Sequence, residues 1–208
     1  MKSGPVIGIV GQVCAGKGTV AGCLGRRGAR VLDADRLVHA LYERQDVKED
    51  VKRVFGTDVF DAGGRVDRSK LASVVFGQAE RLTELTPLLY PRVAVEVQAA
   101  KAEFAKSADP ALVLDAPTLF EAGTDGQCDR ILFVAAPIER REAWAAARNW
   151  PPGEIARREQ WMMDEESKRT RCNAVIDNGG SLEDLERQVG VLWSKWVARD
   201  GKEEELNA

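Results

Sequence analysis

Nine residues near the amino terminus combine glycines and a lysine in the spacing of a phosphate-binding loop. The segment 11–19 (GQVCAGKGT) follows an apolar run at 6–10 and precedes a segment with helical character. A strand, a glycine-bounded loop with lysine and then a helix form the context that such a loop requires. Its backbone N–H groups and the helix N-terminus attract anionic oxygens, and Lys17 adds a charge that reaches the β- and γ-phosphates. We therefore predict a nucleoside triphosphate site formed by Gly11, Cys14, Ala15, Gly16, Lys17, Gly18 and Thr19.

The residue after the lysine departs from the usual motif. In most such loops a serine or threonine follows the lysine and binds Mg²⁺. Here Gly18 takes that place, and the hydroxyl group comes one residue later, at Thr19. The predicted metal ligands are Thr19 and Asp35, and a direct or a water-mediated contact at Thr19 is compatible with the sequence.

Two aspartates follow the second predicted strand, at 29–32. Phosphoryl transfer needs a clamp on the triphosphate, a metal and a positioned acceptor. Asp35 is the candidate to face the acceptor, because a carboxylate there can take a proton from an alcohol or hold a metal-bound water. Asp33 shares its face if the segment is extended, and two adjacent carboxylates favour a cation between them. Helix capping is the alternative role for Asp33. Asp115, which ends the predicted strand 111–115, is a weaker metal or substrate candidate.

Basic residues concentrate in the segment 138–171, where they alternate with glutamates. Most of them are therefore predicted to lie on solvated faces. We select Arg148, because it ends a predicted helix just before the break at Pro151-Pro152, and a guanidinium can stabilise charge on a transferred phosphoryl group. A helical flap carrying it excludes water when it closes. His39, the only histidine, is a surface or substrate-side polar group.

Composition narrows the class of protein. The chain has 208 residues, 44% hydrophobic and 30% charged, with a net charge of −3, which argues against nucleic-acid binding through a basic surface. No apolar run reaches 18 residues, so no membrane span is expected, and no cleavable signal precedes the first strand. The four cysteines lack metal-site spacing and are predicted to be reduced thiols of a cytoplasmic protein. The sequence does not predict an oligomeric state.

Strand and helix patterns alternate along the chain, which predicts an α/β fold with three layers and a parallel central sheet. Helical periodicity extends over 37–55, and two further helices are expected at 69–77 and 78–90, before Pro91 opens another that runs to about residue 106. Ligands bind beyond the carboxyl ends of parallel strands. The loop, the aspartates and Asn178 all follow strands and are therefore expected at one site.

The predicted organisation has four parts. Residues 1–35, 107–137 and 172–200 form a nucleotide-binding core, residues 36–106 form a helical inserted domain, residues 138–171 form a lid, and residues 201–208 form a flexible tail. In the core, Ser181 and Asp184 are predicted to begin the final helix.

Several segments occur in the order and spacing of a known enzyme family. They are Gly8–Thr19, 31–39 (VLDADRLVH), Val75-Phe76, Tyr90-Pro91, 114–121 (LDAPTLFE), Arg157 with Gln160, Glu166 with Lys168, and 175–178 (VIDN). In these segments the chain resembles dephospho-CoA kinases, and the resemblance extends over nearly its whole length. The DAD segment at 33–35 is the most specific part, because generic P-loop proteins lack it.

The resemblance implies a P-loop kinase that uses ATP and Mg²⁺ to phosphorylate the ribose 3′-hydroxyl of dephospho-CoA, the last step of coenzyme A synthesis. It implies Asp35 as the catalytic acid/base, with Lys17 and Arg148 beside it. It also implies that 36–106 binds the acceptor and that Asn178 lies near the adenine. The residues expected on the substrate side are Asp33, Asp35, His39, Tyr90 and Pro117.

The chain departs from the family pattern at several positions. The family has glycine at the positions of Gln12 and Cys14 and serine at those of Ala15 and Gly18. Further departures are Tyr90 for histidine, Thr118 for leucine, Trp144 for arginine and Asn173 for aspartate. Since Lys17, Asp35 and Arg148 are retained, an active enzyme is predicted.

Two alternatives remain open at the level of sequence. The Lys17-Gly18-Thr19 ending resembles adenylate kinase and favours a nucleoside or nucleotide kinase of that type. The substitutions in the loop favour a non-catalytic nucleotide-binding protein. The DAD segment and a helical insertion placed directly after the second strand disfavour the first of these.

Overall fold

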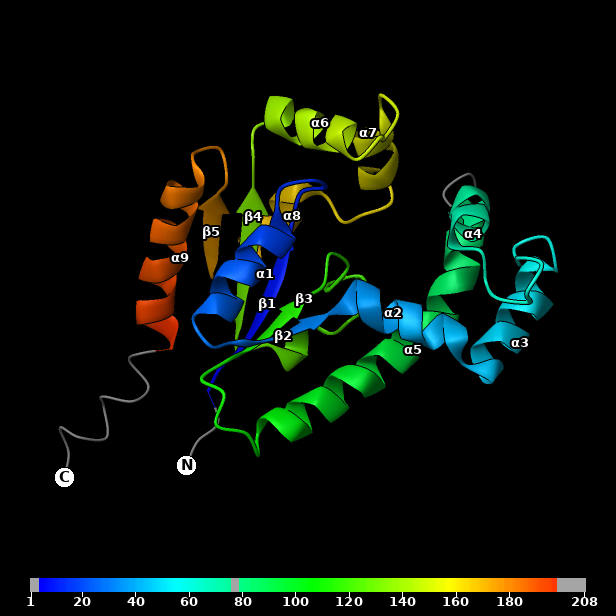
Figure 1. Ribbon diagram of the computed structural model, residues 1–208, viewed down its shortest axis with the longest axis horizontal. Coiled ribbons are helices and arrows are strands. Elements are labelled where there is room, and N and C mark those ends of the chain that lie inside the picture. Colours follow the sequence, from blue (N-terminus) through cyan, green and yellow to red (C-terminus); the bar gives the residue numbers. More distant parts are fainter. Residues whose placement is uncertain (1–3, 76–78, 198–208) are drawn as a thin grey trace. The chain divides into compact units, whose positions relative to one another are not determined.

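A parallel sheet forms the centre of the larger part of the chain in the computed structural model, which describes residues 4–75 and 79–197. Its strand order is β2-β3-β1-β4-β5 (Figure 1), and all four pairings are parallel. The strands are β1 (Val6–Gly11), β2 (Arg30–Asp33), β3 (Leu112–Asp115), β4 (Arg130–Ala135) and β5 (Ala174–Asp177). The predicted α/β fold with a parallel central sheet is confirmed.

The central strand is apolar because helices cover both faces of the sheet. All six residues of β1 are buried. Ile7 and Ile9 belong to the same apolar cluster as residues of α1 (Lys17–Arg26) and α9 (Leu182–Trp196). Val6 points to the other face, where it packs with Phe104 and Leu112. Side chains that alternate along β1 therefore pack against helices on both faces of the sheet.

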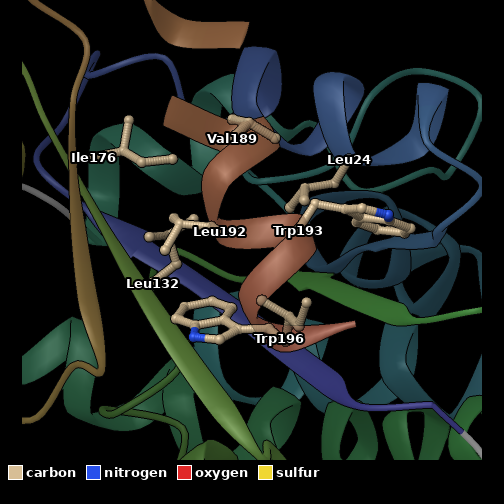
Figure 2. Close-up of a pocket in the computed structure, with 8 residues that line it drawn as sticks. Leu24, Leu132, Ile176, Val189, Leu192, Trp193 and Trp196 are labelled. Carbon is tan, nitrogen blue, oxygen red and sulfur yellow. The ribbon is translucent and has the colours of Figure 1, made fainter. Parts of the chain in front are cut away.

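Helix α9 closes one face of the core. A capping box begins it, in which the Ser181 side chain accepts from the Asp184 N–H and the Asp184 side chain accepts from the Ser181 N–H, as predicted. Figure 2 shows an apolar hollow beneath α9, with Trp193 beside Leu24 of α1 and Trp196 near the strands. Both tryptophans pack on the core. The described residues that line this hollow are aliphatic side chains and two tryptophans of the apolar cluster, so it is part of the core.

The chain divides into two compact units, one formed by Met1–Asp33 with Gln98–Ala208 and the other by Ala34–Val97. In the second unit the helical stretch predicted at 37–55 is two helices, α2 (Ala34–Glu43) and α3 (Gln45–Phe55). The extended backbone of Arg44 separates them. Helix α4 (Arg68–Val75) follows a turn in which the Asp61 carboxylate accepts from the Gly63 and Arg65 N–H groups.

The prediction that Pro91 opens a new helix is wrong. Helix α5 (Ala79–Phe104) is continuous and contains both Pro87 and Pro91. A proline inside a helix removes one backbone hydrogen bond and costs about 3 kcal/mol in isolation. The apolar side chains at every fourth position, which are Leu85, Leu89, Val93 and Val97, are all buried. Their packing offsets the lost hydrogen bonds, which local sequence rules do not take into account. The junction predicted at residues 77–78 lies outside the described residues.

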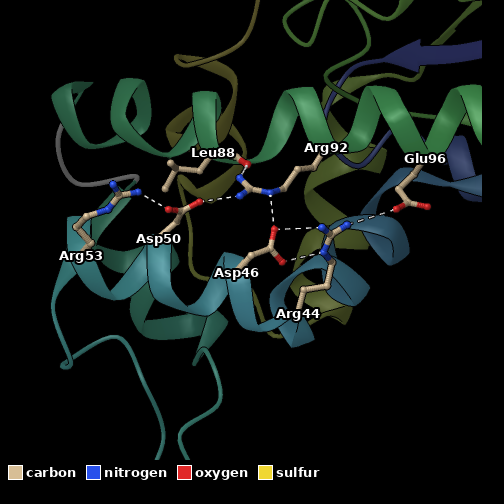
Figure 3. A network of polar contacts seen from close by, with 7 residues as sticks. All are labelled: Arg44, Asp46, Asp50, Arg53, Leu88, Arg92 and Glu96. Atoms are coloured by element: carbon tan, nitrogen blue, oxygen red, sulfur yellow. Dashed lines mark hydrogen bonds and ion pairs between the residues drawn. The ribbon is translucent and has the colours of Figure 1, made fainter.

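An ion-pair network fixes α5 against α3 within the second unit (Figure 3). The Arg92 guanidinium donates to Asp46 at 3.2 Å and to Asp50 at 2.7 Å. Arg44 pairs with Asp46, and Arg53 pairs with Asp50. Because Arg92 is only partly exposed, it links the two carboxylates of one α3 face to the middle of α5.

Three short helices form the segment predicted as a lid. They are α6 (Ile138–Ala147), α7 (Glu154–Glu159) and α8 (Glu165–Thr170). A single turn of 3₁₀ helix, η1 (Asp125–Gln127), precedes β4. The four cysteines carry free thiols. None of the described helices is long and apolar enough to cross a bilayer. The predicted tail 201–208 lies outside the described residues.

Candidate functional site

The predicted polar groups of the core lie at one edge of the sheet. Gly11, Asp33 and Asp115 are the last residues of β1, β2 and β3, and Asn178 directly follows β5. Asp33 and Asp115 are paired in register, so their strands lie about 4.8 Å apart at that point. The carboxyl edge therefore brings two aspartates next to the loop.

The expectation that Asp33 and Asp35 share an extended face is wrong. Helix α2 begins at Ala34, directly after β2. Alternation of side chains at every second residue holds only in extended backbone. The in-register neighbour of Asp33 is Asp115, which the sequence pattern ranked below Asp35.

The loop turns into α1 at a glycine that no other residue can replace without strain. Gly16, the N-cap of α1, has φ 89° and ψ 28°, a left-handed conformation that glycine adopts at no steric cost. A Cβ atom at this position lies 2.3 Å from Asn178 Nδ2. The same Nδ2 donates to the Ala15 carbonyl at 2.9 Å. Asn178 is buried, and its hydrogen bond fixes the loop backbone at Ala15.

Lys17 folds its side chain over the loop. Its Nζ donates to the Gln12 carbonyl at 2.7 Å and to the Gly11 carbonyl at 3.2 Å. The ammonium group thus lies over the start of the loop, where β1 ends. Free N–H groups at a helix N-terminus together with a lysine form an anion-binding site.

Gly18 and Thr19 face different sides of the loop. A Cβ on Gly18 meets only the Asp115 Oδ2, at 3.9 Å. The Thr19 hydroxyl lies 3.9 Å from the position that a Cβ on Gly16 would take. Gly18 and Thr19 both belong to α1, and successive side chains of a helix with about 3.6 residues per turn point roughly 100° apart. The hydroxyl at 19 therefore does not occupy the direction of the side chain that is absent at 18.

Among the described basic residues of 138–171, Arg140 and Arg148 form no ion pair, and of these two Arg148 contacts the loop. Glu154 binds Arg157 and Arg158 through its two oxygens, and the Arg157 guanidinium foremost, followed by that of Arg158, lowers the pKa of the Glu154 carboxyl to about 2. Arg148 has no carboxylate within ion-pair distance in the described part of the chain. Its Nη1 donates to the Cys14 Sγ at 3.5 Å. The C-cap of α6 therefore places this guanidinium at the loop.

The remaining predicted residues are distributed over both units. Asp35 and His39 are exposed and lie one turn apart on α2, so they share a helix face. Tyr90 is half-buried on α5. These three belong to the unit 34–97. Pro117 belongs to the core, where its carbonyl accepts from Lys168 Nζ at 3.4 Å. The structure brings together the loop, Asp33, Asp115, Asn178 and Arg148.

One buried ion pair near the site escaped the sequence reasoning. Lys168, only 3% exposed, lies 2.9 Å from Glu121, and Glu121 also accepts from the Met163 N–H. Both residues stand in the segments that carried the family resemblance. Lys168 stands among charged residues of both signs, so the sequence pattern does not separate its buried charge from a solvated face.

Comparison with known proteins gives consistent matches. A sequence profile described as CoaE: Dephospho-CoA kinase matches residues 5–184. A dephospho-CoA kinase of Thermus thermophilus is 41% identical over 188 residues, which cover 90% of this chain and 89% of that protein. The dephospho-CoA kinase of Aquifex aeolicus is 35% identical over 195 residues, covering 93% and 98%.

Solved structures extend the comparison. The crystal structure of TT1252 from Thermus thermophilus superposes with a TM-score of 0.76 at 38% identity, covering 93% of this chain and 98% of that one. Dephospho-CoA kinase from Campylobacter jejuni gives a TM-score of 0.67 at 17% identity, with the same coverage. At that identity the second match supports the fold alone.

Gly16→Ala tests the geometry of the loop. The added Cβ collides with Asn178 and keeps a strained φ, so we expect the Kd of a nucleoside triphosphate to rise by roughly tenfold or more, as measured by calorimetry. Gly18→Ala is the matched control, because its Cβ meets only Asp115 at contact distance and alanine favours the helix. Equal Kd values for Gly16→Ala and Gly18→Ala contradict the assignment of this loop as the phosphate-binding site.

Proposed function

The chain belongs to the dephospho-CoA kinase family, and we propose that it transfers the γ-phosphate of ATP to the ribose 3′-hydroxyl of dephospho-CoA. The products are coenzyme A and ADP, so the reaction ends coenzyme A synthesis. The observation that carries this proposal is the family match, which spans residues 5–184 and therefore includes both compact units. The substrates are both small molecules, and we place the enzyme in the cytoplasm without a nucleic-acid or membrane partner.

The core supplies the clamp on ATP. The N–H groups at the start of α1 donate to the phosphates, and Lys17 lies over the same loop. Asn178 supports the loop through Ala15, which gives it a positioning role in addition to the expected place near the adenine. Arg148, held at the loop beside Cys14, stabilises the charge that develops on the transferred phosphoryl group.

The unit 34–97 supplies the acceptor side. Asp35 accepts the proton of the ribose hydroxyl as that oxygen attacks phosphorus. Its place in the DAD segment supports this role, since the chain there runs directly from the carboxyl edge of β2 into α2. His39, on the same helix face, and Tyr90 are proposed to contact the acceptor, with Asp33 and Pro117 contributing from the core. The helices of 138–171 are proposed as a lid.

Magnesium is the cation that these kinases require, and it screens charge between the phosphates when bound. The residues fit such an ion at Asp115, because its carboxylate faces the position that a Gly18 side chain would fill, and Asp33 lies in register beside it. We therefore propose Asp115 and Asp33 as the protein ligands, directly or through water. Thr19, the predicted ligand, follows Gly18 in α1, and its side chain points in a different direction from the Gly18 position.

An acceptor comparison tests the proposed reaction. With ATP and Mg²⁺, we expect dephospho-CoA to be phosphorylated efficiently and AMP or deoxynucleosides to react poorly, as measured by ADP release and by mass spectrometry of the product. Efficient phosphorylation of AMP without that of dephospho-CoA supports the adenylate-kinase alternative. ATP binding without transfer to any acceptor supports the non-catalytic alternative.

Asp35→Asn tests the acid/base. The amide keeps the shape of the side chain but cannot accept a proton, so we expect turnover to fall by about a hundredfold or more. ATP binding, measured by calorimetry, should remain close to that of the parent protein. Unchanged turnover shows that Asp35 is not the base.

Gly18→Ser tests the metal site. A serine here directs a hydroxyl toward Asp115, and we expect Mn²⁺, monitored by electron paramagnetic resonance with ADP present, to bind on the order of tenfold more tightly. Gly18→Ala adds the Cβ without the oxygen and should leave Mn²⁺ affinity unchanged, as should Thr19→Val. Weaker Mn²⁺ binding by the Thr19→Val variant shows instead that Thr19 is a metal ligand.

A further inference from the structure

The front half of the P-loop is held by an ion pair from the segment that follows β4. Glu159, the last residue of α7, accepts from the Val13 N–H at 3.0 Å. The same Oε1 accepts from Arg141 Nη1 of α6 at 2.6 Å. Arg141 Nη1 also donates to the Val13 carbonyl, at 3.3 Å. One ion pair therefore holds both polar backbone groups of a single loop residue.

Burial makes Arg141 depend on this partner. The Arg141 side chain is 8% exposed and that of Glu159 is 34% exposed. A buried guanidinium is unfavourable unless a carboxylate and further acceptors compensate it. Within the described residues, Arg141 Nε has no hydrogen-bond partner. Glu159 and the Val13 carbonyl are thus the acceptors that hold this side chain at the loop.

The loop needs support at this point because its next residue is strained. Cys14 has φ 60°, a left-handed conformation that is unfavourable for a residue with a Cβ. The Val13 carbonyl that Arg141 holds belongs to the peptide linking Val13 to Cys14. On the other side of that peptide, Arg148 reaches the Cys14 sulfur. An arginine within α6 and the arginine that caps it therefore hold the strained turn from both sides.

Gln12 provides a second connection between the loop and the same segment. Its Nε2 donates to Glu165 Oε2 at 2.6 Å, and its Oε1 accepts from the Ala136 N–H at 2.9 Å. The loop is thereby joined to α8 and to the start of the connection into α6. Gln12 and Cys14 both stand where glycine is usual in the family that the sequence resembles. At these two positions, side-chain contacts hold the loop in the conformation that glycine would adopt without them.

We infer that Arg141 and Glu159 are positioning residues that hold the P-loop in its phosphate-binding conformation and so make ATP affinity depend on the segment 138–171. This inference rests on the proposed function. It concerns the nucleotide and not the acceptor, because both contacts are to Val13 and neither residue belongs to the unit 34–97. A closing movement of α6 and α7 is then transmitted to the loop through Val13.

Glu159→Ala tests the inference. We expect the Kd and the KM for ATP to rise about tenfold, the usual scale for a lost charge-assisted hydrogen bond, while the KM for dephospho-CoA stays unchanged. Glu159→Gln keeps an oxygen for the Val13 N–H and should restore part of the affinity. Glu142→Ala removes an exposed carboxylate beside Arg141 and is the control, with affinity expected to be unaltered.

A double variant separates positioning from general stability. Glycine at position 14 adopts the left-handed conformation without strain, so in a Cys14→Gly background we expect Glu159→Ala to raise the ATP Kd by only about two- to threefold. An unchanged tenfold effect in that background overturns the inference. An equal rise in the KM values for ATP and for dephospho-CoA, accompanied by a loss of thermal stability, also overturns the inference.

The two hypotheses are distinguishable by experiment. ATP affinity is measured by calorimetry without acceptor, so a different acceptor specificity overturns the proposed reaction and leaves the positioning role standing. If Glu159→Ala does not fold, Glu159→Gln in the presence and absence of Cys14→Gly gives the same comparison. An unaltered ATP Kd in Glu159→Gln and Arg141→Gln together contradicts the inference.

Discussion

Five parallel strands end at one edge of a sheet, and that constraint places the loop, the two aspartates and Asn178 of the nucleotide site. The loop leaves β1 at Gly11, Asp33 and Asp115 end the two strands on one side, and Asn178 follows the outer strand on the other side. Residues more than a hundred positions apart in the chain thereby converge. No local interaction produces this arrangement, since it requires the hydrogen-bond register of all four strand pairs.

The loop itself combines two solutions to one steric problem. Its backbone must leave the usual regions of φ and ψ to aim N–H groups at an anion. At Gly16 the absence of a Cβ solves the problem, and Asn178 occupies the space that a side chain would need. At Cys14 a side chain is present. Arg148 contacts this residue, and Arg141 and Glu159 hold the preceding residue, Val13. The second solution couples the loop to the helices that follow β4.

The proposed metal site involves a similar substitution of partners. No hydroxyl directly follows the lysine, and the hydroxyl one residue later, at Thr19, points in a different direction from the Gly18 position. The carboxylate of Asp115 faces the direction that a side chain at Gly18 would take, with Asp33 as its neighbour in register. Two carboxylates side by side are most stable with a cation between them. In the usual motif one serine or threonine of the loop binds the metal. We therefore propose that here the carboxylates at the strand ends, Asp115 and Asp33, bind the metal beside the loop.

Several elements were predictable because their signals are local. The apolar runs of β1, β3 and β4, the capping box at Ser181 and the end of α6 at Arg148 follow from side-chain pattern and capping chemistry. The continuity of α5 through Pro87 and Pro91 was not predictable, since buried side chains at every fourth position outweigh two missing hydrogen bonds. The break between α2 and α3 at Arg44 was not predicted either, because the apolar spacing continues across it.

By itself the sequence determined the class of fold, the loop as a phosphate site and the family, because glycine, lysine and aspartate at fixed spacing carry those signals over short stretches. Tertiary structure alone decided which groups are neighbours. It paired Asp33 with Asp115 and not with Asp35, placed Asn178 against Gly16 and Ala15, and brought Glu159 to Val13 across 146 positions. Such contacts depend on strand register and on the packing of distant helices, which residue spacing along the sequence does not specify.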